Sequence, residues 1–316
     1  MSIFIKYYPK FYKRKNFIDN LLKIKEAGFD GVFFPSMIPE GLSATGSNRI
    51  EFFPVSRMVE LAKGLGLKTG VILRWFHSSK LWSVDTFSPP VSFSGASYNP
   101  DSWYHPVCPN NPSGLEYCDK LLRKMSKITQ PDYFYLVFFR FPFFWEKEEL
   151  DVQNRIPPFC YCPFCVAEFS SVVGEIINST SKIIEMMPEW LEWRTVTIMN
   201  LLIDAKEVLA RKSRVIVSLP PLSLIDLPFT TGQLPLAFTD EGCLVSPLLH
   251  HISRRKNLLW VEDILDQYRI DVKTNKMFPS FEVSNKKEFE KILELGNHFA
   301  GIIFSHWETF NNLGTG

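Results

Sequence analysis

Hydrophobic residues along this chain fall into two patterns, and the two patterns alternate. Short runs rich in aromatic and β-branched residues predict strands at residues 2–8, 29–35, 67–76, 133–141, 214–219, 243–248, 277–283 and 301–307. Stretches with apolar residues at helical spacing predict helices at residues 16–27, 55–63, 113–128, 188–212, 260–268 and 285–295. The run at 133–141 is almost continuously apolar, which is typical of a strand buried on both faces.

Eight strand–helix alternations in 316 residues favour a closed barrel over an open, doubly wound sheet. No glycine-rich phosphate loop follows the first predicted strand, and no break in composition marks a domain boundary. We therefore predict an α/β fold, a single-domain (β/α)8 TIM barrel over residues 1–316. Two of its strand-to-helix connections are long, namely the loop at 77–112 and a cysteine-rich loop at 143–166.

Charge and composition narrow the choice of partners. The chain carries 35 basic and 34 acidic residues, so no overall field favours nucleic acid or an anionic membrane as a partner. No run of eighteen uncharged apolar residues occurs, and the first residues lack the pattern of a signal peptide. We therefore expect a soluble, cytoplasmic protein without a membrane span. The sequence does not indicate an oligomeric state.

Two glutamates follow the last two predicted strands, where TIM barrels place their active sites. Glu282 lies at the end of strand seven, and Glu308 lies at the end of strand eight. Hydrolysis of a glycosidic bond uses such a carboxylate pair, one as acid and one as nucleophile or base. Glu282 is the predicted nucleophile or base, and Glu308 the predicted acid or its partner. The alternative is that one or both are surface charges or partners of Arg74 or Arg140.

Basic and aromatic residues at other strand ends are candidates for binding a sugar. They are Arg74, Trp75, His77, Arg140, His250, His306 and Trp307. Arg140 lies in an apolar run, so it needs a partner, either a barrel carboxylate or an anionic group of the ligand. The loop at 77–112 is rich in aromatic residues, which could stack on a ligand or form a small core of their own.

Half of the six cysteines lie in the stretch PFCYCPFC, as Cys160, Cys162 and Cys165. Three thiolates from one tight loop can occupy three corners of a tetrahedral zinc site. Cys108 is the candidate for the fourth ligand, because the third and fourth strand-to-helix loops of a barrel are neighbours. A structural zinc, free or disulfide-bonded thiols, and a catalytic use remain alternatives. Catalysis by the carboxylate pair requires no cofactor.

Several of these segments together resemble a group of poorly characterised glycoside-hydrolase-like TIM barrels. The segments are Cys108-Pro109-Asn110-Asn111-Pro112, Arg140-Phe141-Pro142, Cys160 to Cys165 with Phe169, Gly232-Gln233, Ser246-Pro247-Leu248-Leu249-His250 and Gly301-Ile302-Ile303-Phe304. The resemblance implies a barrel that acts on carbohydrate. Two departures stand out: the group carries Asp where this chain has Val137, and Met-x-Tyr where it has Leu248-Leu249. The alternative is therefore a catalytically inactive barrel that binds carbohydrate or a protein partner.

Overall fold

The computed structural model describes residues 1–9, 14–36, 54–100, 103–144, 156–209 and 213–313. Its centre is a closed barrel of eight parallel strands in sequence order, with β1 hydrogen-bonded to β8. The strands are β1 (Ser2–Lys6), β2 (Gly31–Pro35), β3 (Lys68–Arg74), β4 (Tyr133–Val137), β5 (Arg214–Leu219), β6 (Leu244–Leu249), β7 (Ser280–Phe281) and β8 (Gly301–Ser305). The predicted (β/α)8 TIM barrel is confirmed.

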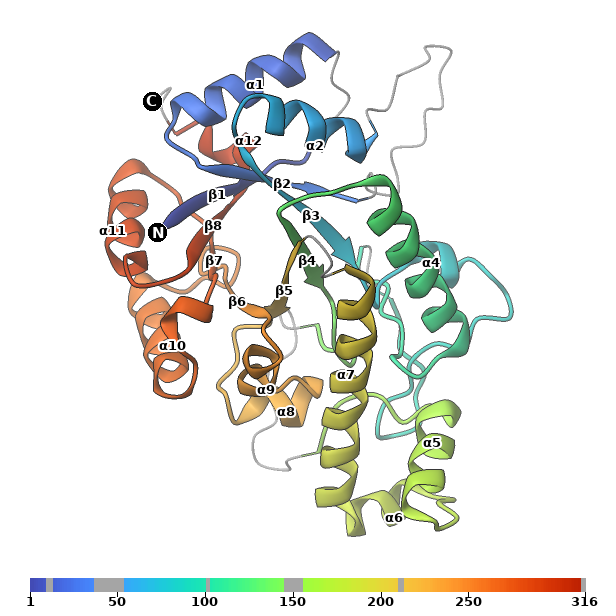
Figure 1. Cartoon of the computed structure of the whole chain (residues 1–316). Coiled ribbons are helices and arrows are strands. Elements are labelled where there is room, and N and C mark those ends of the chain that lie inside the picture. The colour runs from blue at the N-terminus through green and yellow to red at the C-terminus, as the bar shows by residue number, and fades with distance from the viewer. Residues whose placement is uncertain (10–13, 37–53, 101–102, 145–155, 210–212, 314–316) are drawn as a thin grey trace.

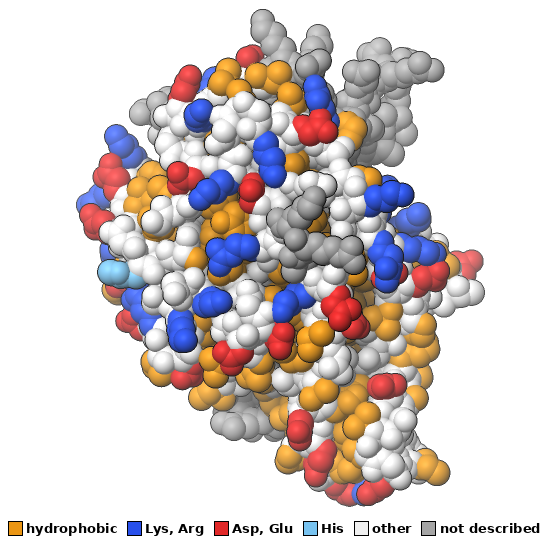
Figure 2. Space-filling model, in the orientation of Figure 1, with side chains coloured by type: hydrophobic (Ala, Val, Ile, Leu, Met, Phe, Trp, Pro, Cys, Tyr) orange, Lys and Arg blue, Asp and Glu red, His pale blue; other side chains and the backbone are white. Residues whose placement is uncertain are grey.

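Helices surround this barrel (Figure 1). They are α1 (Arg14–Glu26), α2 (Val55–Gly64), α3 (Ser79–Trp82), α4 (Pro112–Ile128), α5 (Pro163–Val173), α6 (Thr180–Glu185), α7 (Met187–Leu209), α8 (Asp226–Thr231), α9 (Pro235–Asp240), α10 (Leu258–Asp271), α11 (Lys286–Gly296) and α12 (Trp307–Phe310), with a 3-10 turn at Thr274–Lys276. Helices α5 and α6 and the first turns of α7 extend beyond the barrel at the bottom of the view. On the face in Figure 2, acidic and basic side chains are interspersed, as the balanced composition leads one to expect.

Five strands, β1, β3, β4, β7 and β8, end earlier than the hydrophobic pattern predicts. Strand β4 ends at Val137, because Phe138 adopts a left-handed conformation with φ of 60°. The apolar run continues past that point because Phe139 and Phe141 are buried, Phe139 against Trp75 and Phe141 against Trp193 of α7. Strand β7 has two residues, and β8 ends at Ser305, after which Trp307 begins a short helix. Hydrophobicity marks burial at these places, not extended backbone.

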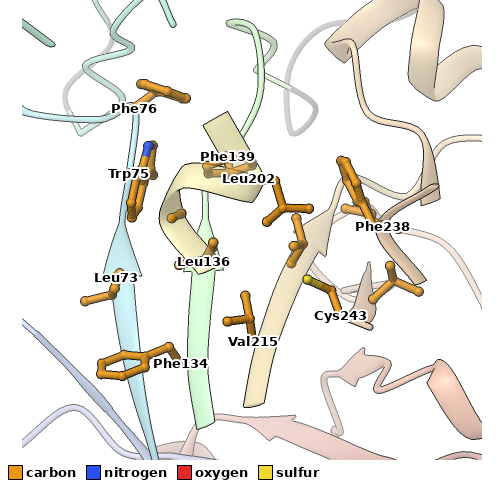
Figure 3. Packing of buried hydrophobic residues seen from close by; sticks show 14 of the residues in the cluster. Leu73, Trp75, Phe76, Phe134, Leu136, Phe139, Leu202, Val215, Phe238 and Cys243 are labelled. Carbon is orange, nitrogen blue, oxygen red and sulfur yellow. The ribbon is translucent and has the colours of Figure 1, made fainter. Parts of the chain in front are cut away.

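Side chains of the strands alternate between two apolar layers. The inner layer fills the barrel and consists of Phe4, Phe33, Ile72, Tyr133, Tyr135, Ile216, Leu244, Phe278 and Ile303. The outer layer lies between the strands and the helices. Figure 3 shows part of it, with side chains of β3, β4 and β5 and Leu202 of α7. This alternation decides which side chain at each strand end faces the barrel mouth.

Aromatic rings in the inner layer require glycine on the neighbouring strand. Gly70 of β3 pairs with Phe33 of β2, and a Cβ on Gly70 would lie 2.1 Å from that ring. We expect Gly70→Ala to lower the free energy of unfolding by about 1–3 kcal/mol, because the packed ring has to shift. Urea denaturation measures the change. Gly64→Ala in α2 is the control: its Cβ meets open space, so stability should stay unchanged or rise.

Candidate functional site

A cavity of about 530 Å³ opens at the carboxyl ends of the strands. Of the residues predicted to form the site, it is lined by Arg74, Arg140, His250, His306 and Glu308. It is also lined by Lys6, Tyr8, Trp103, Tyr135, Val137, Phe138 and Ser218, among others. A depression of about 650 Å³ lies beside Arg269, Thr274 and His298, in the connections that enter β7 and β8 at the opposite end of the barrel. The first cavity has the position of a TIM-barrel active site.

Three residues predicted to contact a sugar lie outside the lining of this cavity. Trp75 follows Arg74 directly, so strand alternation turns it outward, into the layer drawn in Figure 3. Trp307 begins α12, is buried, and donates from Nε1 to Asn20 Oδ1 at 3.3 Å. His77 is buried with its ring stacked on Phe138, 4.8 Å between centroids. These three side chains lie behind the residues that line the cavity.

A buried polar network connects four strands at the floor of the cavity. Lys6 Nζ donates to Ser280 Oγ at 2.9 Å and lies 5.2 Å from the centroid of the Tyr135 ring. His250 Nε2 lies 3.1 Å from the same Ser280 Oγ. The Tyr135 hydroxyl lies 3.0 Å from Ser246 Oγ. Lys6, Tyr135, Ser246 and Ser280 occupy inward positions of β1, β4, β6 and β7, and His250 directly follows β6. Segments far apart in the sequence therefore meet here.

Burial shifts the pKa values of two bases in this network. It lowers the pKa of Lys6 to about 7, and the carboxylate of Glu282 partly opposes the shift. It also lowers the pKa of His250 well below its usual value, with the Lys6 charge acting in the same direction. His250 is therefore a neutral imidazole at physiological pH. Lys6, in contrast, exchanges a proton near neutrality.

We expect Lys6→Met to raise the free energy of unfolding, because methionine carries no charge for burial to penalise. The pKa of Lys6 is about 7 in the folded protein and ordinarily 10.5. Between these values the unfolded chain holds a proton that the folded protein releases, so wild-type stability rises with pH there. The gain from methionine should be on the order of 1–4 kcal/mol below pH 7 and shrink above it. Urea denaturation at about pH 6 and about pH 9 measures it, and equal stability at the lower pH would contradict the expectation.

The two predicted carboxylates take different positions. Glu308 lines the cavity. Glu282 follows β7, accepts from the backbone N–H of Ser253 at 2.9 Å, and also accepts from the Ser253 hydroxyl. It is not among the described residues that line the cavity, although its charge acts on Lys6. Glu282 therefore lies at the edge of the site, oriented by the loop after β6.

Arg140 is 2% exposed and contacts the backbone, not a carboxylate, among the described residues. Its Nη2 donates to Phe143 O at 3.0 Å, and its guanidinium lies 5.4 Å from the centroid of Phe138. Nε and Nη1 are buried without a hydrogen-bond partner among the residues that the structure describes. Such donors are rare in folded proteins and mark places where a ligand can supply the missing acceptor.

The aromatic rings of the long loop at 77–112 take two kinds of position. Trp82 packs against Phe87 and Tyr98, and Tyr98 against Tyr104, with 5.5 to 6.4 Å between ring centroids. These rings form a small core of the loop. Trp103 instead lines the cavity and is 45% exposed. One aromatic face is thus available to a ligand.

Cys108, Cys160, Cys162 and Cys165 form a buried cluster whose sulfur atoms all lie within 4.8 Å of one another. Cys108 Sγ lies 3.2 Å from Cys165 Sγ and 3.6 Å from Cys162 Sγ. Four thiolates around zinc have sulfur–sulfur distances of about 3.8 Å, so the cluster has a size that can hold a metal ion. The predicted fourth member, Cys108, comes from the loop at 77–112. Cys118 lies apart and donates to Trp75 O.

Amide groups surround the cluster. The backbone N–H of Val91 donates to Cys160 Sγ at 3.4 Å, and that of Asn110 donates to Cys108 Sγ at 3.4 Å. Asn110 Nδ2 lies 3.5 Å from Cys165 Sγ. Donors of this kind stabilise negative charge on sulfur, so the surroundings fit thiolate ligands.

No family model and no curated protein matches this chain. Solved structures do. The glycoside hydrolase domain of PgaB (BpsB) from Bordetella bronchiseptica superposes with a TM-score of 0.71 at 10% identity, covering 100% of this chain and 96% of that one. The catalytic domain of a beta-amylase from Paenibacillus polymyxa gives 0.64 at 12% identity, covering 98% and 92%. A beta-galactosidase from Halorubrum lacusprofundi superposes with a TM-score of 0.66 at 10% identity. The match covers 97% of this chain and 52% of that larger protein.

At these identities the similarity establishes the fold: this chain has the type of TIM barrel found in glycoside hydrolases. Among the described residues, no helix combines the length and the apolar composition that crossing a bilayer requires.

Proposed function

We propose that this protein is a carbohydrate-active barrel that hydrolyses a glycosidic bond in the cavity at the carboxyl ends of its strands. The observation that carries the proposal is the position of Glu308, inside a cavity that is walled by Trp103 and basic side chains. A sugar ring offers apolar faces to an aromatic wall and hydroxyl groups to polar residues. The folds of the structural neighbours agree with this assignment.

In this proposal Glu308 protonates the leaving oxygen, and Glu282 acts as nucleophile or base. The two hydrogen bonds from Ser253 hold the Glu282 carboxylate in one orientation. Arg74, Arg140, His250 and His306 position the saccharide, and Trp103 stacks against it. Trp75, His77 and Trp307 support the site from behind instead of contacting the ligand.

A catalytically inactive, carbohydrate-binding barrel is the second candidate, and one observation favours it. Val137 lines the cavity at an inward position of β4, so this strand contributes no carboxylate. Glu308 is then the one carboxylate among the described lining residues. A protein partner at the barrel mouth in place of a sugar belongs to the same candidate.

A glycan-library hydrolysis screen distinguishes the two candidates. We expect turnover by the wild-type protein and its loss in Glu308→Gln and Glu282→Gln. Binding without turnover would favour the inactive barrel, and activity that survives both substitutions would contradict the residue assignment. A crystal structure with a bound saccharide adds the carboxylate separation, about 5–5.5 Å for a retaining pair and about 6.5–9.5 Å for an inverting pair.

We also propose that the four clustered cysteines hold a structural zinc ion. The charge of Arg194 supports this proposal over four neutral thiols. Arg194 of α7 is fully buried and donates to the backbone oxygens of Phe159 and Thr230 at 2.6 and 2.9 Å. Burial lowers the pKa of Arg194, whereas the ionisable groups of Tyr161, Cys165, Cys160 and Cys108 act to raise it. A zinc tetrathiolate is a dianion and would compensate this buried cation.

The zinc would connect the loop at 77–112 to the loop that leads into α5. These loops already touch, because the backbone N–H of Tyr161 donates to Val91 O at 2.8 Å. In this role the ion shapes one wall of the barrel mouth and takes no part in the reaction. Metal analysis of protein purified without chelator should find one zinc per chain. Protein free of zinc and of other metals would remove the proposal.

A further inference from the structure

The cavity at the barrel mouth is basic. Its described lining contains three basic side chains, Lys6, Arg74 and Arg140, and one carboxylate, that of Glu308. The chain as a whole is nearly neutral, so this excess is local to the cavity. A cavity with low-dielectric walls concentrates such a field and attracts ligands of the opposite charge.

The two arginines lie at the carboxyl ends of neighbouring strands, Arg74 on β3 and Arg140 in the connection after β4. Arg74 is the last residue of β3 and pairs in register with Val137 of β4, and Arg140 follows Val137 by three residues. Arg74 makes no hydrogen bond or ion pair with another described residue, although its charge acts on Tyr8 and His77. Arg140 has two buried nitrogens with no acceptor in the described part of the chain. Both guanidinium groups therefore lack a counter-ion within the described part of the chain.

Val137 explains why β4 supplies no counter-ion to Arg74. Its side chain faces the cavity directly beside Arg74, and a carboxylate at this position would pair with the guanidinium. With valine there, the donors of Arg74 remain available. Guanidinium groups bind planar or tetrahedral oxyanions through paired hydrogen bonds, whereas a neutral hydroxyl satisfies one donor and leaves the charge uncompensated.

We propose that the cavity selects an anionic saccharide, whose carboxylate, sulfate or phosphate group is bound by Arg74 and Arg140. This inference rests on the proposed function, that the cavity binds carbohydrate. The sugar ring lies against Trp103, and its hydroxyl groups meet Lys6 and His250. Glu308, on α12 after β8, acts on the glycosidic bond.

Binding measurements test the proposal without requiring turnover. Calorimetric titration compares four matched oligosaccharides: a neutral one, its uronate, its sulfate ester and its phosphate ester. We expect the wild-type protein to bind at least one anionic member about ten- to a hundredfold more tightly than the neutral one, as a charged hydrogen-bond pair predicts. The uronate and ester arms identify which oxyanion is recognised. Equal affinity for all four would overturn the proposal.

Variants assign the preference to the arginines. Arg74 is half-buried, so Arg74→Gln should fold and lose most of the anionic preference. Val137→Asp should have the same effect by supplying an internal counter-ion. Lys120→Gln, an exposed cation on α4 paired only with Glu116 among the described residues, is the control and should change nothing. A preference that survives both Arg74→Gln and Val137→Asp would overturn the assignment.

The outcomes separate this inference from the proposed function. Binding of neutral and charged saccharides alike leaves the carbohydrate site standing and contradicts the anionic preference. If inorganic sulfate or phosphate binds and none of the four saccharides does, both the carbohydrate site and its preference for an anionic saccharide are contradicted. Affinity for the anionic member should also fall as salt is added, because the ion pairs are screened.

Discussion

Cys108→Ser is expected to release zinc and to lower the free energy of unfolding by about 3 kcal/mol or more. Cys108 is the one member of the cluster on the loop at 77–112, and the other three lie between residues 160 and 165. Its loss would remove the metal link between the two loops and leave the charge of Arg194 without compensation. Removing the metal would also leave three buried thiols crowded together, with their amide donors aimed at neutral sulfur.

Metal content and urea denaturation of the same preparations measure this prediction. Cys118→Ser is the matched control, because Cys118 is equally buried but lies outside the cluster. Serine at 118 keeps a donor for Trp75 O, so this variant should retain its zinc. Identical stability of the two variants, or a wild-type protein without metal, would contradict a zinc site. A disulfide between two of the four cysteines would be detected as a mass loss of two hydrogens.

Glu308→Gln is expected to reduce kcat on the best substrate by about 10²- to 10⁴-fold, with little change in KM. The amide keeps the shape of the side chain and much of its hydrogen bonding, but it cannot donate the proton that the leaving oxygen needs. Loss of an interaction made only in the transition state therefore lowers kcat and kcat/KM together.

Steady-state kinetics on the substrate found in the screen measure this effect. Glu290→Gln on the exposed side of α11 is the control, because it changes the net charge equally and lies on the surface. A tenfold or larger increase in KM at constant kcat would show a binding role for Glu308. An unchanged kcat would contradict its assignment as the acid.

Local patterns in the sequence predict the barrel because each strand and helix buries its own hydrophobic residues. Eight alternations are enough to specify the architecture, and the structure closes the barrel in that order. The cysteine cluster is also predictable, since three of its members are close in sequence and Cys108 lies on the neighbouring loop. Strand ends are less predictable: at Phe138 the backbone turns while burial continues.

The composition of the site depends on contacts between residues far apart in the chain. Lys6 and Ser280 are 274 positions apart and meet only because β1, β7 and β8 are neighbours in a closed barrel. The importance of Lys6 comes from its burial and shifted pKa, which no local motif signals. Its place at the end of the first strand is the one signal in the sequence that could have pointed to it.

By itself, the sequence determined the class of fold and the set of cysteines that cluster. It also determined that the two long strand-to-helix loops lie at the barrel mouth. Only the tertiary structure decided that Arg74 faces the cavity while Trp75 faces the helices, and that Glu308 lies inside the cavity while Glu282 lies at its edge. The physical reason is that hydrophobic periodicity is read from residues close together in the sequence and reports only which of them are buried. Orientation at a strand end depends on where the strand stops, and this is set by packing across the whole barrel.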